Sequence, residues 1–151
     1  MWTSVLELFS IGLGPSSSHA IGPMRAGRRF VRRLGAEGLL DRAARIRVTL
    51  YGSLAWTGKG HGTDRAILLG LAGYDPETVD PDEAARFFDG VLSTARLPLE
   101  HGPTVAWDPA CDMVFDRKTL VGQHPNALDI RAEDGSGMGL LDARYYSIGG
   151  G

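Results

Sequence analysis

Three consecutive serines and a histidine follow a Gly-Pro turn near the start of this 151-residue chain: Ser16, Ser17, Ser18 and His19. One serine is enough to cap a helix, so a triplet is more than a cap requires. Hydroxyls and the free N–H groups of a first helical turn both suit a bound carboxylate or phosphate. His19 adds a group that changes protonation near neutral pH. The segment predicts a small-anion site; an ordinary N-cap and a backbone-bonded histidine are the structural alternatives.

His61 lies between two glycines in a second polar segment, residues 51–64. Glycine neighbours let the backbone adopt unusual angles, so the ring can project into a cleft. Lys59 could bind a carboxylate directly, or it could lower the pKa of His61 by like-charge repulsion. A neutral imidazole near pH 7 can serve as a general base. The alternative is a surface-loop histidine that covers the start of the following helix.

A third polar segment, His124-Pro125-Asn126, stands before a predicted strand, although proline and asparagine are also common in turns. His101 has only turn-forming neighbours and is expected to be structural. The four histidines show neither the i, i+4 spacing nor the short-loop spacing of a metal-ligand set. The residues themselves therefore predict no metal site.

The composition is that of an ordinary globular protein, with 43% apolar and 23% charged residues, and it suits one domain over residues 1–151. A formal net charge of −2 gives no general attraction to nucleic acid or to anionic membranes. The only cysteine, Cys111, excludes an internal disulfide and favours a cytoplasmic setting; it is expected to be small and buried. One cysteine cannot hold an iron–sulfur cluster. No apolar run approaches the roughly 20 residues needed to span a bilayer.

Helical periodicity dominates the first half of the chain. It predicts a short helix ending near Ser10, a helix over about 18–34 with Pro23 as an alternative start, and a helix from 81 through Leu92. Thr63 and Asp64 are expected to cap a further helix that ends near residue 71. Five arginines in the 18–34 helix are interpreted as its solvated side: Arg25, Arg28, Arg29, Arg32 and Arg33.

Alternating apolar residues dominate the second half, after a first strand over residues 45–51 in which Ile46, Val48 and Leu50 face the core. Further strands are expected around 105–107, 113–115, 128–130 and 141–145, with a hairpin turn at 134–137. The order of elements predicts an α+β fold: a mainly antiparallel sheet of four or five strands, covered by helices on one face.

Taken together, these segments resemble bacterial iron–sulfur-dependent L-serine dehydratase, also called L-serine ammonia-lyase. The resemblance covers essentially the whole chain and rests on four motifs in the same order. They are Gly14-Pro15-Ser16-Ser17-Ser18-His19, Tyr51-Gly52-Ser53-Leu54-Ala55 with Thr57-Gly58-Lys59-Gly60-His61-Gly62-Thr63-Asp64, His124-Pro125-Asn126, and Tyr146-Ser147-Ile148-Gly149-Gly150-Gly151. Only the family's β domain or subunit is represented, so we expect a fragment of a longer protein or assembly.

The resemblance implies a partner, a catalytic domain or subunit whose cysteines hold a [4Fe–4S] cluster. The cluster helps the serine hydroxyl to leave, a base removes the α-proton, and the product decays to pyruvate and ammonia. No cofactor is expected in this chain, which is expected to be inactive alone. The family's β domain is similar in fold to the allosteric substrate-binding domain of phosphoglycerate dehydrogenase. A homodimer is expected, and threonine stays open as a side substrate.

Carried over residue by residue, the resemblance implies that His61 is the base, assisted by His19. Ser16, Ser17 and Ser18 would line the pocket near the substrate carboxylate. Supporting or carboxylate contacts would come from Lys59, Thr63 and Asn126. Ala20 departs from the family, which usually has threonine after the histidine, so one hydroxyl contact would be missing.

Two other functions stay open. The same polar loops fit a regulatory module that binds serine or another small anion and controls a catalytic partner. A purely structural dimerisation domain is the third interpretation, which exposed Trp2 and Trp56 would support, but it leaves the serine triplet unexplained. Anion recognition needs hydrogen-bond donors but no group that changes protonation, so the two histidines in glycine-flanked loops favour catalysis.

Overall fold

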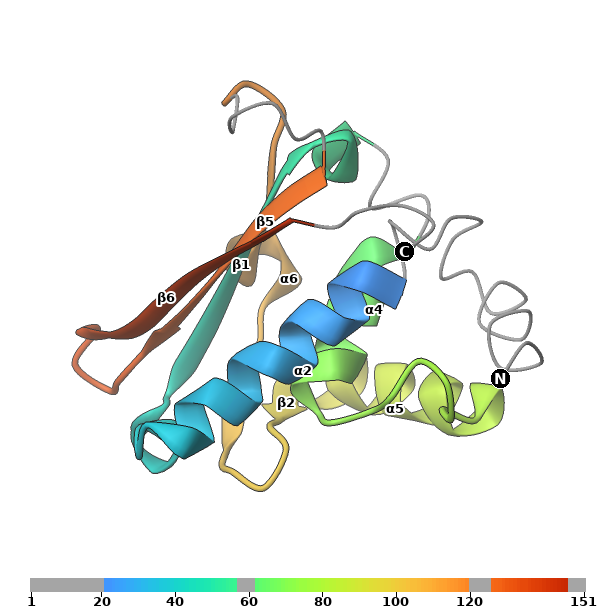
Figure 1. The fold of residues 1–151 in the computed structure, drawn as a ribbon. Helices are drawn as coiled ribbons and strands as arrows, with labels where there is room; N and C mark the ends of the chain where they lie inside the picture. The colour runs from blue at the N-terminus through green and yellow to red at the C-terminus, as the bar shows by residue number, and fades with distance from the viewer. Residues whose placement is uncertain (1–20, 57–61, 120–125, 147–151) are drawn as a thin grey trace.

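The structure is a computed structural model that describes residues 21–56, 62–119 and 126–146. The short helix expected to end near Ser10 lies outside these residues. The described part has the predicted α+β fold, with helices gathered over one face of a twisted, mostly antiparallel sheet (Figure 1). Within the described ranges, no helix combines the length and apolarity that a membrane crossing would need.

The sheet is built around its first strand, β1 (Arg45–Gly52). On one side β1 pairs antiparallel over its whole length with β5 (Asn126–Glu133), which in turn pairs antiparallel with β6 (Gly139–Tyr146). On its other side β1 pairs in parallel with β3 (Thr104–Ala106) and β4 (Met113–Asp116). Among the described strands, the order across the sheet is β2-β3-β1-β5-β6. The sequence pattern did not indicate β2 (Arg96–Pro98).

The alternation predicted for the strands is confirmed. Ile46, Val48 and Leu50 are fully buried on the helix side of β1, and residues between them are more exposed. The hairpin turn between β5 and β6 is also confirmed, because Gly137 donates its N–H to the Asp134 carbonyl at 3.0 Å. This pattern leaves one face of the sheet apolar and the opposite face polar, which is the usual arrangement of an antiparallel sheet covered on one side.

Three longer helices supply the cover: α2 (Ile21–Ala36), α4 (Thr63–Leu71) and α5 (Pro81–Thr94). The described part of α2 already includes Ile21, so Pro23 is not its start. At α5 the prediction holds, with Pro81 in the first turn and the Asp80 side chain accepting a hydrogen bond from the Glu83 N–H at 2.9 Å. Two short elements, η1 (Leu40–Arg42) and α6 (Pro109–Asp112), were not indicated by periodicity.

The predicted capping of α4 is wrong. The N-cap is Gly62, with φ of 76°, and Thr63 and Asp64 lie in the first turn. A left-handed residue at this position reverses the chain into the helix, and glycine adopts it at no steric cost. Thr63 is fully buried there.

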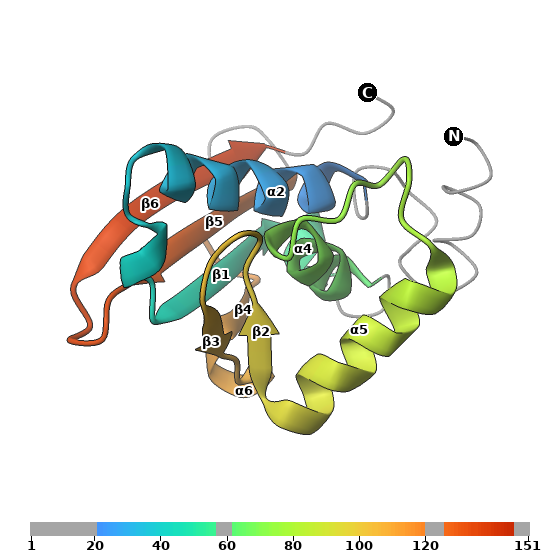
Figure 2. The ribbon, with the colours of Figure 1, turned by 90° about the horizontal axis from the view of Figure 1, so that it is seen from below.

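Helices α2 and α4 cross at two glycines, Gly27 and Gly70, where the backbones touch (Figure 2). A Cβ on Gly27 would lie 2.6 Å from the Ile67 carbonyl oxygen, and a Cβ on Gly70 would collide with the Met24 carbonyl. This close approach presses α4 against α2 and lets both helices share one core.

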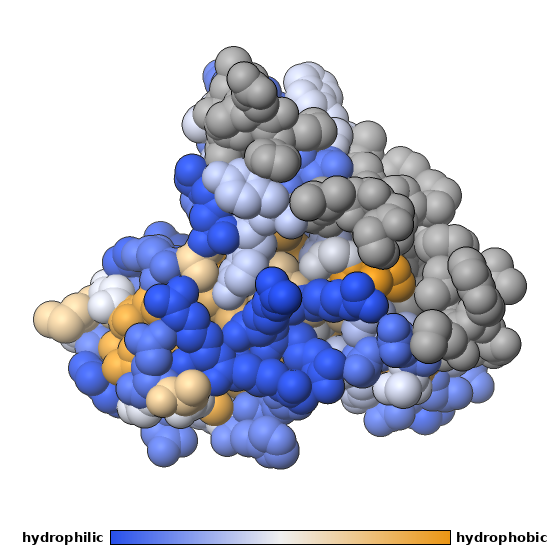
Figure 3. All heavy atoms as spheres, in the orientation of Figure 1, coloured by the Kyte–Doolittle hydropathy of each residue, from blue (hydrophilic) through white to orange (hydrophobic). Residues whose placement is uncertain are grey.

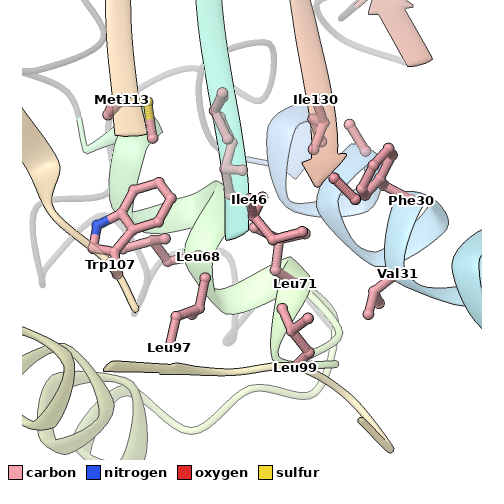
Figure 4. Close-up of a cluster of buried hydrophobic side chains, with 14 of the residues drawn as sticks. Phe30, Val31, Ile46, Leu68, Leu71, Leu97, Leu99, Trp107, Met113 and Ile130 are labelled. Carbon is pink, nitrogen blue, oxygen red and sulfur yellow. The ribbon is translucent and has the colours of Figure 1, made fainter. Parts of the chain in front are cut away.

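That core lies between α2, α4 and the sheet (Figure 4). Phe30 of α2, Leu71 of α4 and Ile46 of β1 are all fully buried in it. A smaller apolar cluster, which includes Met24 and Phe88, joins the start of α2 to α5.

The outer side of α2 carries the five arginines as predicted, and hydrophilic side chains gather over it (Figure 3). Four of them form ion pairs at 2.7–3.4 Å: Arg25 with Glu77, Arg28 with Asp75, Arg32 with Glu100, and Arg33 with Glu37. These pairs tie α2 to the loops around it.

Cys111 was expected to be buried, but it is exposed in α6. The Asp108 cap and Pro109 start a helical turn there, so the residue does not belong to a strand. His101 lies in an exposed turn with φ of 56°, as its neighbours predicted.

The glycine contact between α2 and α4 predicts opposite effects for two Gly→Ala changes. Gly70→Ala should lower the free energy of unfolding by about 1–3 kcal/mol, because the new methyl group meets backbone that cannot move aside. Gly90→Ala is the matched control: its Cβ would find no described atom within 4 Å on the exposed side of α5. It should raise the free energy of unfolding by about 0.5–1 kcal/mol through helix propensity. Urea unfolding measures both, and equal effects would contradict the close-contact account.

Candidate functional site

Most of the predicted site residues lie outside the described residues: Ser16, Ser17, Ser18, His19, Lys59 and His61. Two predicted residues, Thr63 and Asn126, are described. What the structure provides is therefore the frame on either side of segments 57–61 and 120–125.

Two left-handed glycines bracket residues 53–61. Gly52 ends β1 with φ of 59°, and Gly62 precedes α4 with φ of 76°. Both angles lie in the region that side chains with a Cβ adopt only at a cost. The glycines thus set how the chain leaves the sheet and how it enters α4, and residues 53–56 form a helical turn after the first of them.

Asn126 is placed beside that helical turn. It is the first residue of β5 and lies opposite Gly52 in the antiparallel pair. Ser53 donates its hydroxyl hydrogen bond to the Asn126 side-chain oxygen. The end of the β1 segment and the start of β5 are therefore fixed to each other at the same edge of the sheet (Figure 1).

A second contact joins the helical turn after β1 to the end of β4. Arg117, just after β4, lies over the ring of Trp56, with its guanidinium carbon 5.2 Å from the ring centre. The turn that presents Arg117 is held by Asp116, which accepts the backbone N–H groups of Lys118 and Thr119 at 3.0 and 2.9 Å. Those hydrogen bonds, first of all from Thr119, lower the pKa of Asp116. Trp56 remains 67% exposed, so this contact lies at the surface.

Thr63 occupies a different environment. It is fully buried in the first turn of α4, directly after Gly62. In this position its side chain is part of the packing that fixes the start of the helix.

A polar cluster adjoins this edge on the open face of the sheet. Asp129 accepts two hydrogen bonds from Arg144, at 2.7 and 2.9 Å, and one from the Tyr51 hydroxyl at 2.8 Å. Burial opposes the charge of Asp129, but these hydrogen bonds outweigh it and lower the pKa of the carboxyl. Burial and the bond to Asp129 raise the pKa of Tyr51. The cluster holds β1, β5 and β6 together.

Sequence reasoning missed Arg117 and the cluster around Asp129, because neither carries a motif. Ser53 stood within a quoted motif, but nothing in the sequence indicated its bond to Asn126. Elsewhere, a cavity of about 120 Å³ between α4, α5 and α6 contains no predicted site residue. Among described residues, no group of three or more His, Cys, Asp or Glu side chains could hold a metal ion.

Comparisons with a family model and with individual known proteins point to the same family. A family model described as "Serine dehydratase beta chain" matches residues 4–151. The chain is 49% identical to an L-serine dehydratase of Streptomyces coelicolor, 44% identical to L-serine dehydratase TdcG of Escherichia coli, and 43% identical to an L-serine dehydratase of Haemophilus influenzae. These matches cover 98–100% of this chain and 32–33% of each relative. The chain therefore spans about a third of the length of the relatives it matches.

The Asp129 cluster predicts a pH-dependent contribution to stability. Asp129→Asn should lower the free energy of unfolding by about 1 kcal/mol at pH 7, since the charge-assisted bonds from Arg144 are weakened. A carboxyl with a lowered folded-state pKa stabilises the protein above its unfolded pKa of about 4, and this contribution disappears as pH falls through the folded value. Urea unfolding at pH 7 and at pH 3 should therefore show a difference that shrinks in acid. Asp142→Asn, at a 65% exposed carboxyl, is the control and should have a much smaller effect.

Proposed function

The chain belongs to the serine dehydratase beta chain family, and on that premise we propose that it forms the β domain of an L-serine dehydratase. The whole enzyme would convert L-serine into pyruvate and ammonia. The observation that carries the proposal on the structural side is the double contact between the flanks of two polar segments. Ser53 bonds to Asn126, and Arg117 lies over Trp56.

These contacts support a shared site because they bring together the described flanks of two polar segments. The resemblance assigns residues in or next to both segments to one reaction. Segment 57–61, which contains Lys59 and His61, starts one residue after Trp56. Segment 120–125 ends directly before Asn126. Because Ser53 and Asn126 touch, the described flanks of the two segments lie together, and on this basis we propose that both segments contribute to one site.

In this proposal His61 takes the α-proton of serine as a neutral imidazole, and His19 assists through a hydrogen bond to the substrate or through its effect on the pKa of the site. The hydroxyls of Ser16, Ser17 and Ser18 bind the substrate carboxylate, with Lys59 and the Asn126 amide as further contacts. Thr63 is buried, so we assign it the positioning of Gly62 and α4 rather than a direct contact with substrate.

The [4Fe–4S] cluster that the resemblance implies does not fit the donors of this chain. Cys111 is the only cysteine, and it is exposed in α6. A hydrogen bond with Asp108, first among the causes, raises the pKa of its thiol, which disfavours the thiolate that a metal needs. We therefore propose that the remaining two thirds of the enzyme bind the cluster. That part would form a catalytic domain or subunit that closes on the end of the sheet where β1 ends and β5 begins.

The role of His61 predicts a large kinetic effect in the full-length enzyme. His61→Ala should lower turnover of L-serine at least about 100-fold, the scale of losing a general base, with iron content unchanged. His101→Asn is the control, because His101 is exposed in a turn and asparagine tolerates its left-handed backbone. Near-normal turnover of His61→Ala would contradict the assignment. If that variant kept its turnover but lost its response to serine concentration, the regulatory module would be the better interpretation.

The division of labour predicts that residues 1–151 alone are folded but inactive. The described residues enclose a continuous apolar core, so thermal unfolding of the purified chain should be cooperative. Incubation with L-serine should yield no pyruvate, because no cluster can assemble on one cysteine. Detectable pyruvate formation by this chain would overturn the two-domain proposal.

A further inference from the structure

Strand β6 forms an outer edge of the sheet. It is eight residues long, contains no proline, and among the described strands it pairs only with β5. Its one register shift falls at the Ala132/Glu133 end, so Leu141–Tyr146 is regular. Proteins usually protect such an edge with proline, bulges or a covering element, because its outward N–H and C=O groups can pair with another strand. The regular part of β6 has none of these among the described residues.

Apolar side chains on β6 are incompletely covered. Leu141, Ala143 and Tyr145 all point to the face that α2 covers and contact the core, yet each is only partly buried. Their equivalents on β5, Leu128, Ile130 and Ala132, are fully buried. An additional strand beside β6 would bury the partly exposed row.

Charges on the opposite face of β6 alternate in sign. Asp142 accepts a hydrogen bond from Arg131 at 2.8 Å, and Arg144 donates to Asp129 at 2.7 Å. Each of these pairs lies directly across from its partner in the β5–β6 ladder. Both strands read negative, neutral, positive in chain order, and because they are antiparallel each charge on β6 faces the opposite charge on β5.

We propose that β6 pairs antiparallel with β6 of a second copy of this chain, about a twofold axis at Ala143. This interface goes beyond the proposed function and does not depend on it. Directly opposed side chains in a sheet lie on the same face. With a twofold axis perpendicular to the sheet, the pairing of the two β6 strands can therefore shift only by steps that keep every side chain on its own face. An axis at Asp142 would oppose two aspartates, and an axis at Arg144 would oppose two arginines. The axis at Ala143 opposes Asp142 to Arg144 of the second copy, twice.

That register extends the charge pattern across the interface. One row reads Asp129 and Arg144 of one copy, then Asp142 and Arg131 of the other, with alternating sign throughout. The symmetry repeats the row in the opposite direction. On the α2 face, Leu141 meets Tyr145 of the second copy and Ala143 meets its equivalent. Unlike charges and apolar pairs directly opposed across strands are the contacts that stabilise a sheet. The two sheets become continuous, an isologous interface of small size and correspondingly modest affinity.

Charge reversal tests both the edge and the register in the 151-residue chain, by sedimentation equilibrium. The unaltered chain should dimerise with a dissociation constant below about 100 μM. Asp142→Arg opposes arginines and Arg144→Asp opposes aspartates, so each variant alone should associate at least about tenfold more weakly. Mixed in equal amounts, the two variants oppose unlike charges again and should form a heterodimer. Since mixing changes no contact within either chain, recovery reports on the interface alone.

A cysteine bridge tests the position of the axis independently. Directly opposed residues of antiparallel strands have Cα atoms about 4.5–5.5 Å apart, within disulfide range. In a Cys111→Ser background, Ala143→Cys should therefore oxidise to a covalent dimer. Leu92→Cys, at an exposed position on α5, is the control and should remain monomeric under the same oxidant. A monomeric unaltered chain, undiminished association of both charge variants, or no recovery on mixing would each overturn the proposal, as would equal cross-linking at positions 143 and 92.

Discussion

The antiparallel pairing of β1 with β5 is the constraint on which the rest of the structure depends. Eight residues of each strand are paired, from Arg45 with Glu133 to Gly52 with Asn126. The register places Val48 opposite Ile130 on the buried face, so both strands supply the floor of the core. A shift by one residue would turn every apolar side chain to the polar face. The same register brings Asn126 to Ser53. The pairing of β1 with β5 therefore determines both the core and this contact at the candidate site.

The helices depend on that floor in a different way. Gly27 and Gly70 allow α2 and α4 to touch backbone to backbone, and this close pair then covers β1, β5 and β6. Gly52 and Gly62 act at the edge, where the chain must leave the sheet and start α4. Glycine thus has two roles in this fold, close approach in the helix pair and left-handed turns beside the site. Both roles follow from the missing Cβ.

The open face of the sheet is polar, in contrast to the face that the helices cover. Several of its charged side chains form ion pairs across strands, as with Asp129 and Arg144. Our two proposals assign two surfaces to this domain, one for a catalytic partner and one for a second copy of the chain. In our proposals the 53–62 and 117–126 regions take the first role and β6 takes the second. The two surfaces involve different residues, so both contacts can form together.

The sequence by itself determined the identity of the elements and the family. Alternation identified β1, β5 and β6, and Pro81 identified the start of α5, because periodicity and helix-start signals are local properties of the chain. Local patterns did not reveal β2 and α6, which are too short to show a period, and they misplaced the cap of α4 and the exposure of Cys111. Only the tertiary structure decided that Ser53 meets Asn126, that Arg117 covers Trp56, and that Asp129 meets Arg144. These contacts join residues far apart in the chain, and strand register and helix crossing, which no local pattern encodes, bring them together.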